Sequence, residues 1–158
     1  MKGQKTLFSK SSDESDEWAT PKALIQEIEA EFGKIELDPC CTAENCKGQT
    51  GYDKDADGLS EPWTSKLVFV NPPYSDIKSW VRKCYEECIY YGRAKTIVLL
   101  IPARTDTIWF HNHIWDRHLH KPQRGREVRF LKGRLRFEGG LHPAPFPSML
   151  VIWRRDGT

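Results

Sequence analysis

The sequence lacks long hydrophobic runs. No apolar stretch among its 158 residues approaches the ~20 residues that a membrane-spanning helix needs. Residues 1–15 are polar and lack the apolar segment of a secretory signal. The five cysteines are odd in number and unevenly spaced, which argues against a disulfide framework and for a reducing compartment. These absences predict a cytoplasmic protein without a membrane segment.

The sequence also lacks the paired CxxC motifs of a zinc ribbon. Cys40, Cys41 and Cys46 are spaced differently, and Cys84 and Cys88 fall on the apolar face of an expected helix, where packing explains them. We interpret a group of histidines as surface or nucleic-acid-contacting residues rather than ligands: His111, His113, His118 and His120. The sequence therefore predicts no metal site.

Charge is unevenly distributed along the chain, although the formal net charge is only +2. Residues 13–38 contain nine acidic residues and two lysines, whereas residues 117–136 contain eight lysines and arginines and a single acid. Such a basic segment indicates a polyanionic partner, although a solvated basic hairpin would have the same composition. No obligate protein partner is evident.

Composition and periodicity predict one α/β domain over residues 16–154, preceded by a disordered tail at residues 1–15. Thr20 as N-cap and Pro21 at the first helical position predict a helix that ends at Gly33. Residues 40–63 are expected to form a loop. The other expected elements are strands at 35–37, 67–70, 96–101 and 148–153, helices at 77–88 and 109–115, and a hairpin of 127–131 with 134–137.

The strand expected at residues 67–70 ends abruptly at Asn71-Pro72-Pro73-Tyr74, because proline cannot donate the next ladder hydrogen bond. Ligands bind beyond the carboxyl ends of strands in open α/β sheets, so this polar loop lies where a site is expected. Asn71 offers an amide oxygen, Pro72 a carbonyl oxygen and Tyr74 a flat aromatic face. Together they suit a planar base that carries an amino group.

This tetrapeptide resembles the Asn/Asp-Pro-Pro-Tyr/Phe signature of methyltransferases that modify exocyclic amino nitrogens. Trp18-Ala19-Thr20-Pro21, Leu37-Asp38-Pro39-Cys40 and Asp57-Gly58-Leu59 resemble cofactor elements of the same enzymes. With the closing segments near Arg134-Leu135-Arg136 and Pro145-Phe146-Pro147, the pattern is similar to the phage-type DNA N6-adenine methyltransferases from about Asp16 to Trp153.

The resemblance implies a Rossmann-like methyltransferase fold with a mostly parallel sheet and an antiparallel C-terminal hairpin. It implies S-adenosyl-L-methionine as methyl donor, DNA as partner, a flipped-out adenine as acceptor, and the host cytoplasm as location if the protein is phage-encoded. The catalytic residues would be Asn71, Pro72, Pro73 and Tyr74. The cofactor-binding residues would be Trp18, Thr20, Pro21, Asp38, Pro39, Asp57, Leu59 and Asn71.

The basic C-terminal half supplies the expected DNA-contacting residues. Arg134 and Arg136 alternate with Leu135 and Phe137, so the two arginines should face solvent together. The expected DNA-contacting set is Arg104, Arg124, Arg126, Lys132, Arg134 and Arg136.

Two departures from the family pattern keep alternatives open. No glycine-rich turn follows Asp38-Pro39, and the acid that holds the ribose is not assignable, with Asp53 and Asp55 as candidates. One alternative is a methyltransferase for an RNA base or a protein glutamine. Another is a nucleic-acid-binding module with a decayed cofactor site.

Overall fold

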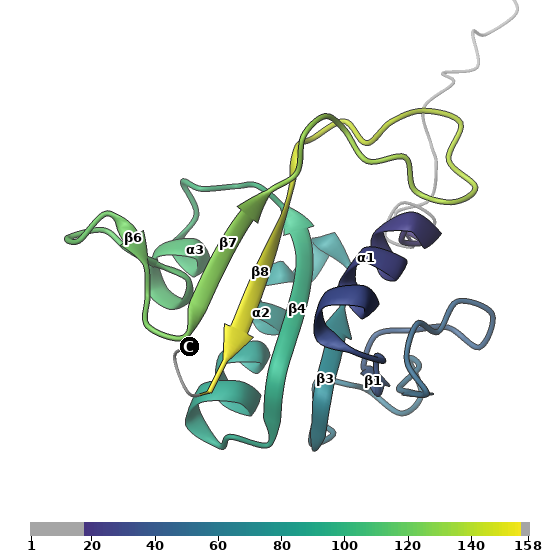
Figure 1. Ribbon diagram of the computed structural model, residues 1–158, viewed down its shortest axis with the longest axis horizontal. Coiled ribbons are helices and arrows are strands. Elements are labelled where there is room, and N and C mark those ends of the chain that lie inside the picture. Colours follow the sequence, from purple (N-terminus) through teal and green to yellow (C-terminus); the bar gives the residue numbers. More distant parts are fainter. Residues whose placement is uncertain (1–17, 156–158) are drawn as a thin grey trace, which may run out of the picture.

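The computed structural model describes residues 18–155, which form a mixed α/β fold around a six-stranded sheet of order β2-β1-β3-β4-β8-β7 (Figure 1). Strands β2, β1, β3 and β4 run parallel, and β8 and β7 are antiparallel additions that form a hairpin-like ribbon at one side. The strands are β1 (Leu37–Asp38), β2 (Thr50–Gly51), β3 (Ser65–Val70), β4 (Ala94–Pro102), β7 (Arg126–Phe130) and β8 (Ser148–Arg154). This architecture confirms the predicted fold class.

Helices cover both faces of the sheet (Figure 1). Alternate residues of β3 point to opposite faces, so Leu67 and Phe69 pack with α1 and Val68 and Val70 pack with α2. The helical elements are α1 (Lys22–Phe32), a 3-10 turn η1 (Tyr74–Asp76), α2 (Ile77–Tyr85), a π-helical turn η2 (Glu86–Tyr90) and α3 (Ile108–His113). A small ribbon of β5 (Trp115–Asp116) and β6 (Lys121–Pro122) lies outside the main sheet. None of the helices within residues 18–155 is long and apolar enough to cross a membrane.

Most predicted elements are present, with different ends. The helix expected at residues 77–88 is α2, which continues into the π-helical turn η2 before Gly92 at φ 64°. The prediction that Thr20 caps the first helix is wrong, because Pro21 is the N-cap and no side chain caps the helix. The loop expected at residues 40–63 contains the short strand β2. The expected tail at residues 1–15 lies outside the described residues.

The predicted pairing of residues 127–131 with 134–137 is also wrong. β7 pairs with β8 instead, and the chain after Phe130 leaves the sheet in a long excursion that returns at Ser148 (Figure 1). Leu135 and Phe137 nevertheless pack with α1, while Arg134 and Arg136 are exposed. The alternation of apolar and basic residues therefore reflects burial of one side of the segment and not pairing with a neighbouring strand.

Strand directions divide the sheet into two edges. The carboxyl ends of β1, β3, β4 and β7 lie at one edge, which we call the Asn71 edge. The amino ends of β4 and β7 and the carboxyl end of β8 lie at the other, which we call the Arg126 edge. The excursion between Phe130 and Ser148 belongs to the Asn71 edge (Figure 1).

Candidate functional site

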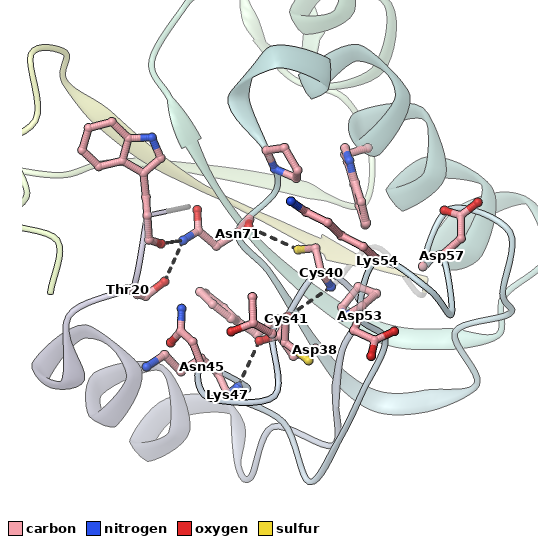
Figure 2. A pocket seen from close by; sticks show the side chains of 17 residues that line it. Thr20, Asp38, Cys40, Cys41, Asn45, Lys47, Asp53, Lys54, Asp57 and Asn71 are labelled. Carbon is pink, nitrogen blue, oxygen red and sulfur yellow. Dashed lines mark hydrogen bonds between the residues drawn. The ribbon is translucent and has the colours of Figure 1, made fainter. Parts of the chain in front are cut away.

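A pocket of about 220 Å³ lies at the Asn71 edge, beyond the ends of β1 and β3 (Figure 2). It is lined by most of the residues that the sequence predicted as catalytic or cofactor-binding, namely Trp18, Thr20, Asp38, Pro39, Asp57, Asn71 and Pro73. Pro21, Leu59, Pro72 and Tyr74 adjoin these residues in the chain without lining the pocket. The fold thus brings together segments that lie far apart in the sequence.

Asn71 is the most connected side chain of the site. Its Nδ2 donates to the backbone oxygen of Trp18 and, over 3.0 Å, to Oγ1 of Thr20. Its Oδ1 accepts a hydrogen bond of 3.2 Å from the hydroxyl of Tyr74, and its backbone oxygen accepts one from Sγ of Cys40. These bonds fix the orientation of the amide and leave Oδ1 with capacity for a further donor.

Asp38 is the buried acid of the pocket, with only 4% of its surface exposed. Its carboxylate accepts backbone N–H groups of Cys40 over 3.2 Å and of Lys47 over 3.0 Å. Burial raises the pKa of Asp38 to about 6, because these donors and the charge of Lys47 only partly offset the loss of water. A cationic ligand group would complete the compensation of this carboxylate.

An aromatic cluster stands beside Asn71. The rings of Trp18 and Tyr74 are close to parallel, with centroids 6.4 Å apart and an interplanar angle of 19°. Phe146, from the excursion, meets both rings edge-on at 5.9 and 5.3 Å. Burial raises the pKa of the Tyr74 phenol, so this hydroxyl stays protonated and donates to Asn71.

The segment Asp57-Gly58-Leu59 forms a tight turn against Asp38-Pro39. A Cβ at Gly58 would lie 1.8 Å from the Pro39 oxygen, so only glycine allows this approach. The Asp57 carboxylate accepts the N–H of Leu59 over 3.2 Å and the hydroxyl of Ser60 over 2.7 Å. The close contact holds Asp57 at the rim of the pocket, and Leu59 packs into the core beneath it.

The sequence is similar to a known protein family and to two phage proteins. A family model for DNA N-6-adenine-methyltransferase (Dam) matches residues 9–155. The chain belongs to this family. It is 33% identical over 96 residues to a DNA N-6-adenine-methyltransferase of Escherichia phage T1, a match that covers 60% of the chain and 39% of the relative. It is 30% identical over 103 residues to a DNA N-6-adenine-methyltransferase of Haemophilus phage HP1 (strain HP1c1), covering 65% of the chain and 58% of the relative. The chain therefore matches less than two thirds of the length of these relatives.

In this Dam-family chain, the pocket contains residues that sequence reasoning did not single out. Asn45, Lys47 and Lys54 line it, and Lys47 also lies 3.8 Å from the carboxylate of Glu138. They come from residues 40–63, where no periodicity gave a signal. Of the two candidate ribose acids, Asp53 lines the pocket and its carboxylate accepts the N–H groups of Asp55 and Ala56.

The expected DNA-contacting residues of this family member divide between the two edges. Arg124 and Arg126 lie at the Arg126 edge, where Gly125 accepts a backbone hydrogen bond from Arg154. Arg126 is partly buried and donates to the backbone oxygens of His113 and Arg124. Arg124 is exposed, and so are the four cations in segments of the Asn71 edge: Arg104, Lys132, Arg134 and Arg136.

Arg126 also stacks on aromatic rings. Its guanidinium carbon lies 5.0 Å from the ring centre of Trp153 and 5.5 Å from that of Tyr85. These contacts assign Arg126 to packing, in contrast to the four exposed cations at the Asn71 edge.

Proposed function

We propose that this protein is an S-adenosyl-L-methionine-dependent DNA methyltransferase that acts on the N6 amino group of adenine. The observation that carries the proposal is the position of Asn71, which links a pocket containing a buried carboxylate to an aromatic cluster. Family membership and the names of the two phage relatives support the same reaction. We infer the cytoplasm of a bacterial host as the place of action, because both relatives are phage proteins.

The residues of the pocket fit S-adenosyl-L-methionine, which when bound supplies an electrophilic methyl group. The buried carboxylate of Asp38 has unmet hydrogen-bonding capacity and would hold the cationic ammonium of the cofactor. Asp57, at the rim of the pocket, would accept the adenine amino group of the cofactor. Trp18 and Thr20 would complete the wall on the side of Asn71.

The chain's own residues account for activation of the target amine. The lone pair of adenine N6 is delocalised into the ring, so the nitrogen becomes nucleophilic when its protons are accepted and it can pyramidalise. Asn71 Oδ1 and the Pro72 carbonyl would accept these protons, and Tyr74 would stack on the base. No covalent enzyme intermediate is needed. Proximity and alignment can supply on the order of 7–11 kcal/mol of the barrier reduction.

The target base must leave the duplex before it reaches this loop, at a cost of a few kcal/mol in unpairing and unstacking. The near-parallel rings of Trp18 and Tyr74 offer an aromatic surface that would offset part of this cost. The exposed cations of the Asn71 edge would hold the flanking phosphates: Arg104, Lys132, Arg134 and Arg136. The base and the backbone would then be held at the same edge of the sheet.

The test is methyl transfer to DNA by Asn71 variants, measured with isotope-labelled S-adenosyl-L-methionine and followed by nucleoside analysis of the product. Asn71→Ala should lower the rate about a hundredfold or more, since a transition-state hydrogen bond contributes ~3–4 kcal/mol. Asn71→Asp keeps an acceptor oxygen and should retain more activity than Asn71→Ala. Asn112→Ala, on the exposed side of α3, is the matched control.

Undiminished turnover by Asn71→Ala would remove Asn71 from catalysis. Label found only in RNA or in protein glutamine would change the substrate class. A chain that does not bind S-adenosyl-L-methionine in a titration would instead be a nucleic-acid-binding module.

A further inference from the structure

Three potential metal ligands converge on the β1–β2 side of the pocket, and two of them, Asp38 and Cys41, line it. Within residues 18–155, Asp38, Cys41 and Cys46 are the one group of three or more such residues whose ligand atoms lie close together. A carboxylate oxygen and the two sulfur atoms are all within 4.8 Å of one another. Asp38 is buried, Cys41 is at least half-buried and Cys46 is the most exposed of the three, so the group opens to solvent on the side of Cys46.

Local backbone structure brings these residues together. β1 ends at Asp38 and pairs in parallel with β2 through Asp38 and Gly51. Cys41 is held beside β2 by a backbone hydrogen bond of 3.1 Å to Tyr52, and a turn closed by Asn45 and Thr42 returns the chain to Cys46. Backbone hydrogen bonds thus place Asp38 and Cys41, and the turn of Thr42 and Asn45 directly precedes Cys46.

Gly51 provides the space for the two sulfur atoms. A Cβ at this position would lie 2.2 Å from Sγ of Cys41 and 2.3 Å from Sγ of Cys46. Any other residue would displace the thiols. Sγ of Cys46 makes weak contacts of 3.8 Å with the backbone oxygens of Gly48 and Thr50 and shares a thiol hydrogen bond with Cys41, so a metal would replace only weak thiol hydrogen bonds.

We propose that Asp38, Cys41 and Cys46 form a binding site for a thiophilic divalent cation of the zinc class. Two thiolates and one carboxylate are ligands that Zn²⁺ accepts, and a water molecule would fill the fourth, solvent-facing position. Zn–S bonds of ~2.3 Å require only a small closure of the observed cluster. Both thiols release their protons to solvent on binding. This proposal departs from the sequence-based prediction, which considered cysteine spacing without Asp38.

Without a bound metal ion, the surroundings of the cluster favour the protonated thiol of Cys41. Burial raises the pKa of Cys41 to about 12, with further contributions from the hydrogen bond to Cys46 and the charge of Asp38. A divalent cation would reverse this effect, because it stabilises both the thiolates and the carboxylate. The nearby positive charge of Lys47 lowers the pKa of Asp38.

The site has a consequence for the cofactor. Asp38 is both a proposed metal ligand and the proposed partner of the cofactor ammonium, so the cation and S-adenosyl-L-methionine should compete for one carboxylate. This consequence rests on the proposed function, whereas the metal site itself does not.

The metal site can be tested by titrating Co²⁺ into the full chain, with a phosphine reductant present to keep both thiols reduced. We expect one equivalent to bind, with sulfur-to-cobalt charge-transfer absorption that Zn²⁺ abolishes. Cys41→Ser and Cys46→Ser should each weaken this absorption and lower the affinity at least tenfold. Cys88→Ser, at a buried cysteine of η2 outside the cluster, is the cysteine control and should bind as the parent does.

Substoichiometric binding, or equal binding by the parent and both variants, would overturn the metal site. Cys46 is exposed, so its replacement is compatible with folding and keeps this test decisive. A second titration measures the affinity for S-adenosyl-L-methionine with and without saturating Zn²⁺, and we expect at least a tenfold loss. Unchanged affinity would overturn the competition alone, and a chain that binds the metal but never the cofactor would overturn the proposed function instead.

Discussion

The buried carboxylates Asp38 and Glu87 lie at opposite edges of the sheet and differ in how far neighbouring donors and cations compensate their charge. Glu87 has no exposed surface and is surrounded by donors: Nζ of Lys83 at 2.7 Å, two nitrogens of Arg93 at 2.8 Å and the N–H of Trp63 at 3.0 Å. Asp38 accepts hydrogen bonds from two backbone N–H groups, and Lys47 acts on it only through its charge, not through a side-chain hydrogen bond. Glu87 lies toward the Arg126 edge, and Asp38 lies at the Asn71 edge.

The two pKa values move in opposite directions. Burial alone would raise the pKa of Glu87, but the hydrogen bonds from Arg93, Lys83 and Trp63 together lower it. Burial dominates at Asp38 and raises its pKa to about 6. The carboxylate of Glu87 is fully compensated, links η2 to the start of β4 and stabilises the fold. The carboxylate of Asp38 is only partly compensated, which indicates a ligand-binding site.

The largest effect that would sharpen this comparison is the loss of the Glu87 charge. Glu87→Gln leaves Lys83 and Arg93 without a counter-charge in a buried site, which typically costs ~3–5 kcal/mol. Arg93 is 37% exposed at its side chain and can be hydrated, so we expect the lower end, about 3 kcal/mol. Chemical denaturation measures this loss in the free energy of unfolding. Cofactor affinity of the folded protein should not change.

The neighbouring residue provides the control for Glu87. Glu86 forms an exposed i,i+4 ion pair with Arg82 at 2.9 Å, so Glu86→Gln should cost less than about 1 kcal/mol. If the two variants lose the same stability, Glu87 is not the anchor that its contacts indicate.

Removal of the Asp38 charge should lower cofactor affinity more than it lowers the free energy of unfolding, the reverse of the effect expected for Glu87. Asp38→Asn should weaken S-adenosyl-L-methionine binding by ~1.5–3 kcal/mol, because a charge-assisted hydrogen bond to the cofactor ammonium is lost. Its free energy of unfolding should fall by no more than about 1 kcal/mol, since relief of a desolvated charge offsets one lost acceptor. Asp106→Asn, in an exposed loop, is the control in the same titration. Greater loss of stability than of affinity would make Asp38 a scaffold residue like Glu87.

The pH dependence separates the two roles of Asp38. Its folded-state pKa of about 6 exceeds the ordinary 3.8, so its contribution to stability is complete below pH ~4 and is lost as the pH rises through about 6. Cofactor affinity should show the reverse trend, because the ionised form binds the ammonium. We expect up to about a tenfold loss of affinity per pH unit below 6, measured by calorimetric titration. A profile that stays the same in Asp38→Asn would assign the titration to another group.

The sequence predicted the central part of the site well, for a local physical reason. β3 is an apolar run ended by two prolines, so its end and the Asn71 loop are both encoded within a few residues. Gly92 likewise ended its helix as predicted. Elements of this kind depend on local sterics and burial, and both can be read from the spacing of apolar residues, prolines and glycines in the sequence. The roles assigned to Asn71 and its neighbours stay predictions.

The failures all involve partners distant in the chain. The alternation at residues 134–137 correctly indicated that Phe137 is buried and Leu135 partly buried, but packing on α1 and pairing in a sheet give the same pattern. Thr20 has the chemistry of an N-cap, but its hydroxyl instead accepts a hydrogen bond from Asn71. The grouping of Asp38 with Cys46 depends on the pairing of two very short strands, which no periodicity encodes.

The smallest expected effect concerns DNA binding, where we expect residues at the Asn71 edge, and not those at the Arg126 edge, to contact phosphates. Each phosphate contact that is lost should flatten the dependence of log affinity on log salt by about 0.9. Arg134→Ala/Arg136→Ala should therefore reduce the slope by about one unit per residue, measured by fluorescence anisotropy with labelled duplex DNA. Arg124→Ala should leave the slope unchanged, because Arg124 lies at the Arg126 edge, away from the proposed DNA-contacting cations. The substitution keeps the backbone oxygen that Arg126 contacts. Cofactor affinity should stay constant in both variants, since none of the three arginines lines the pocket. If Arg124→Ala flattens the slope as much as the double variant does, DNA contacts both edges and the functional division between them is wrong.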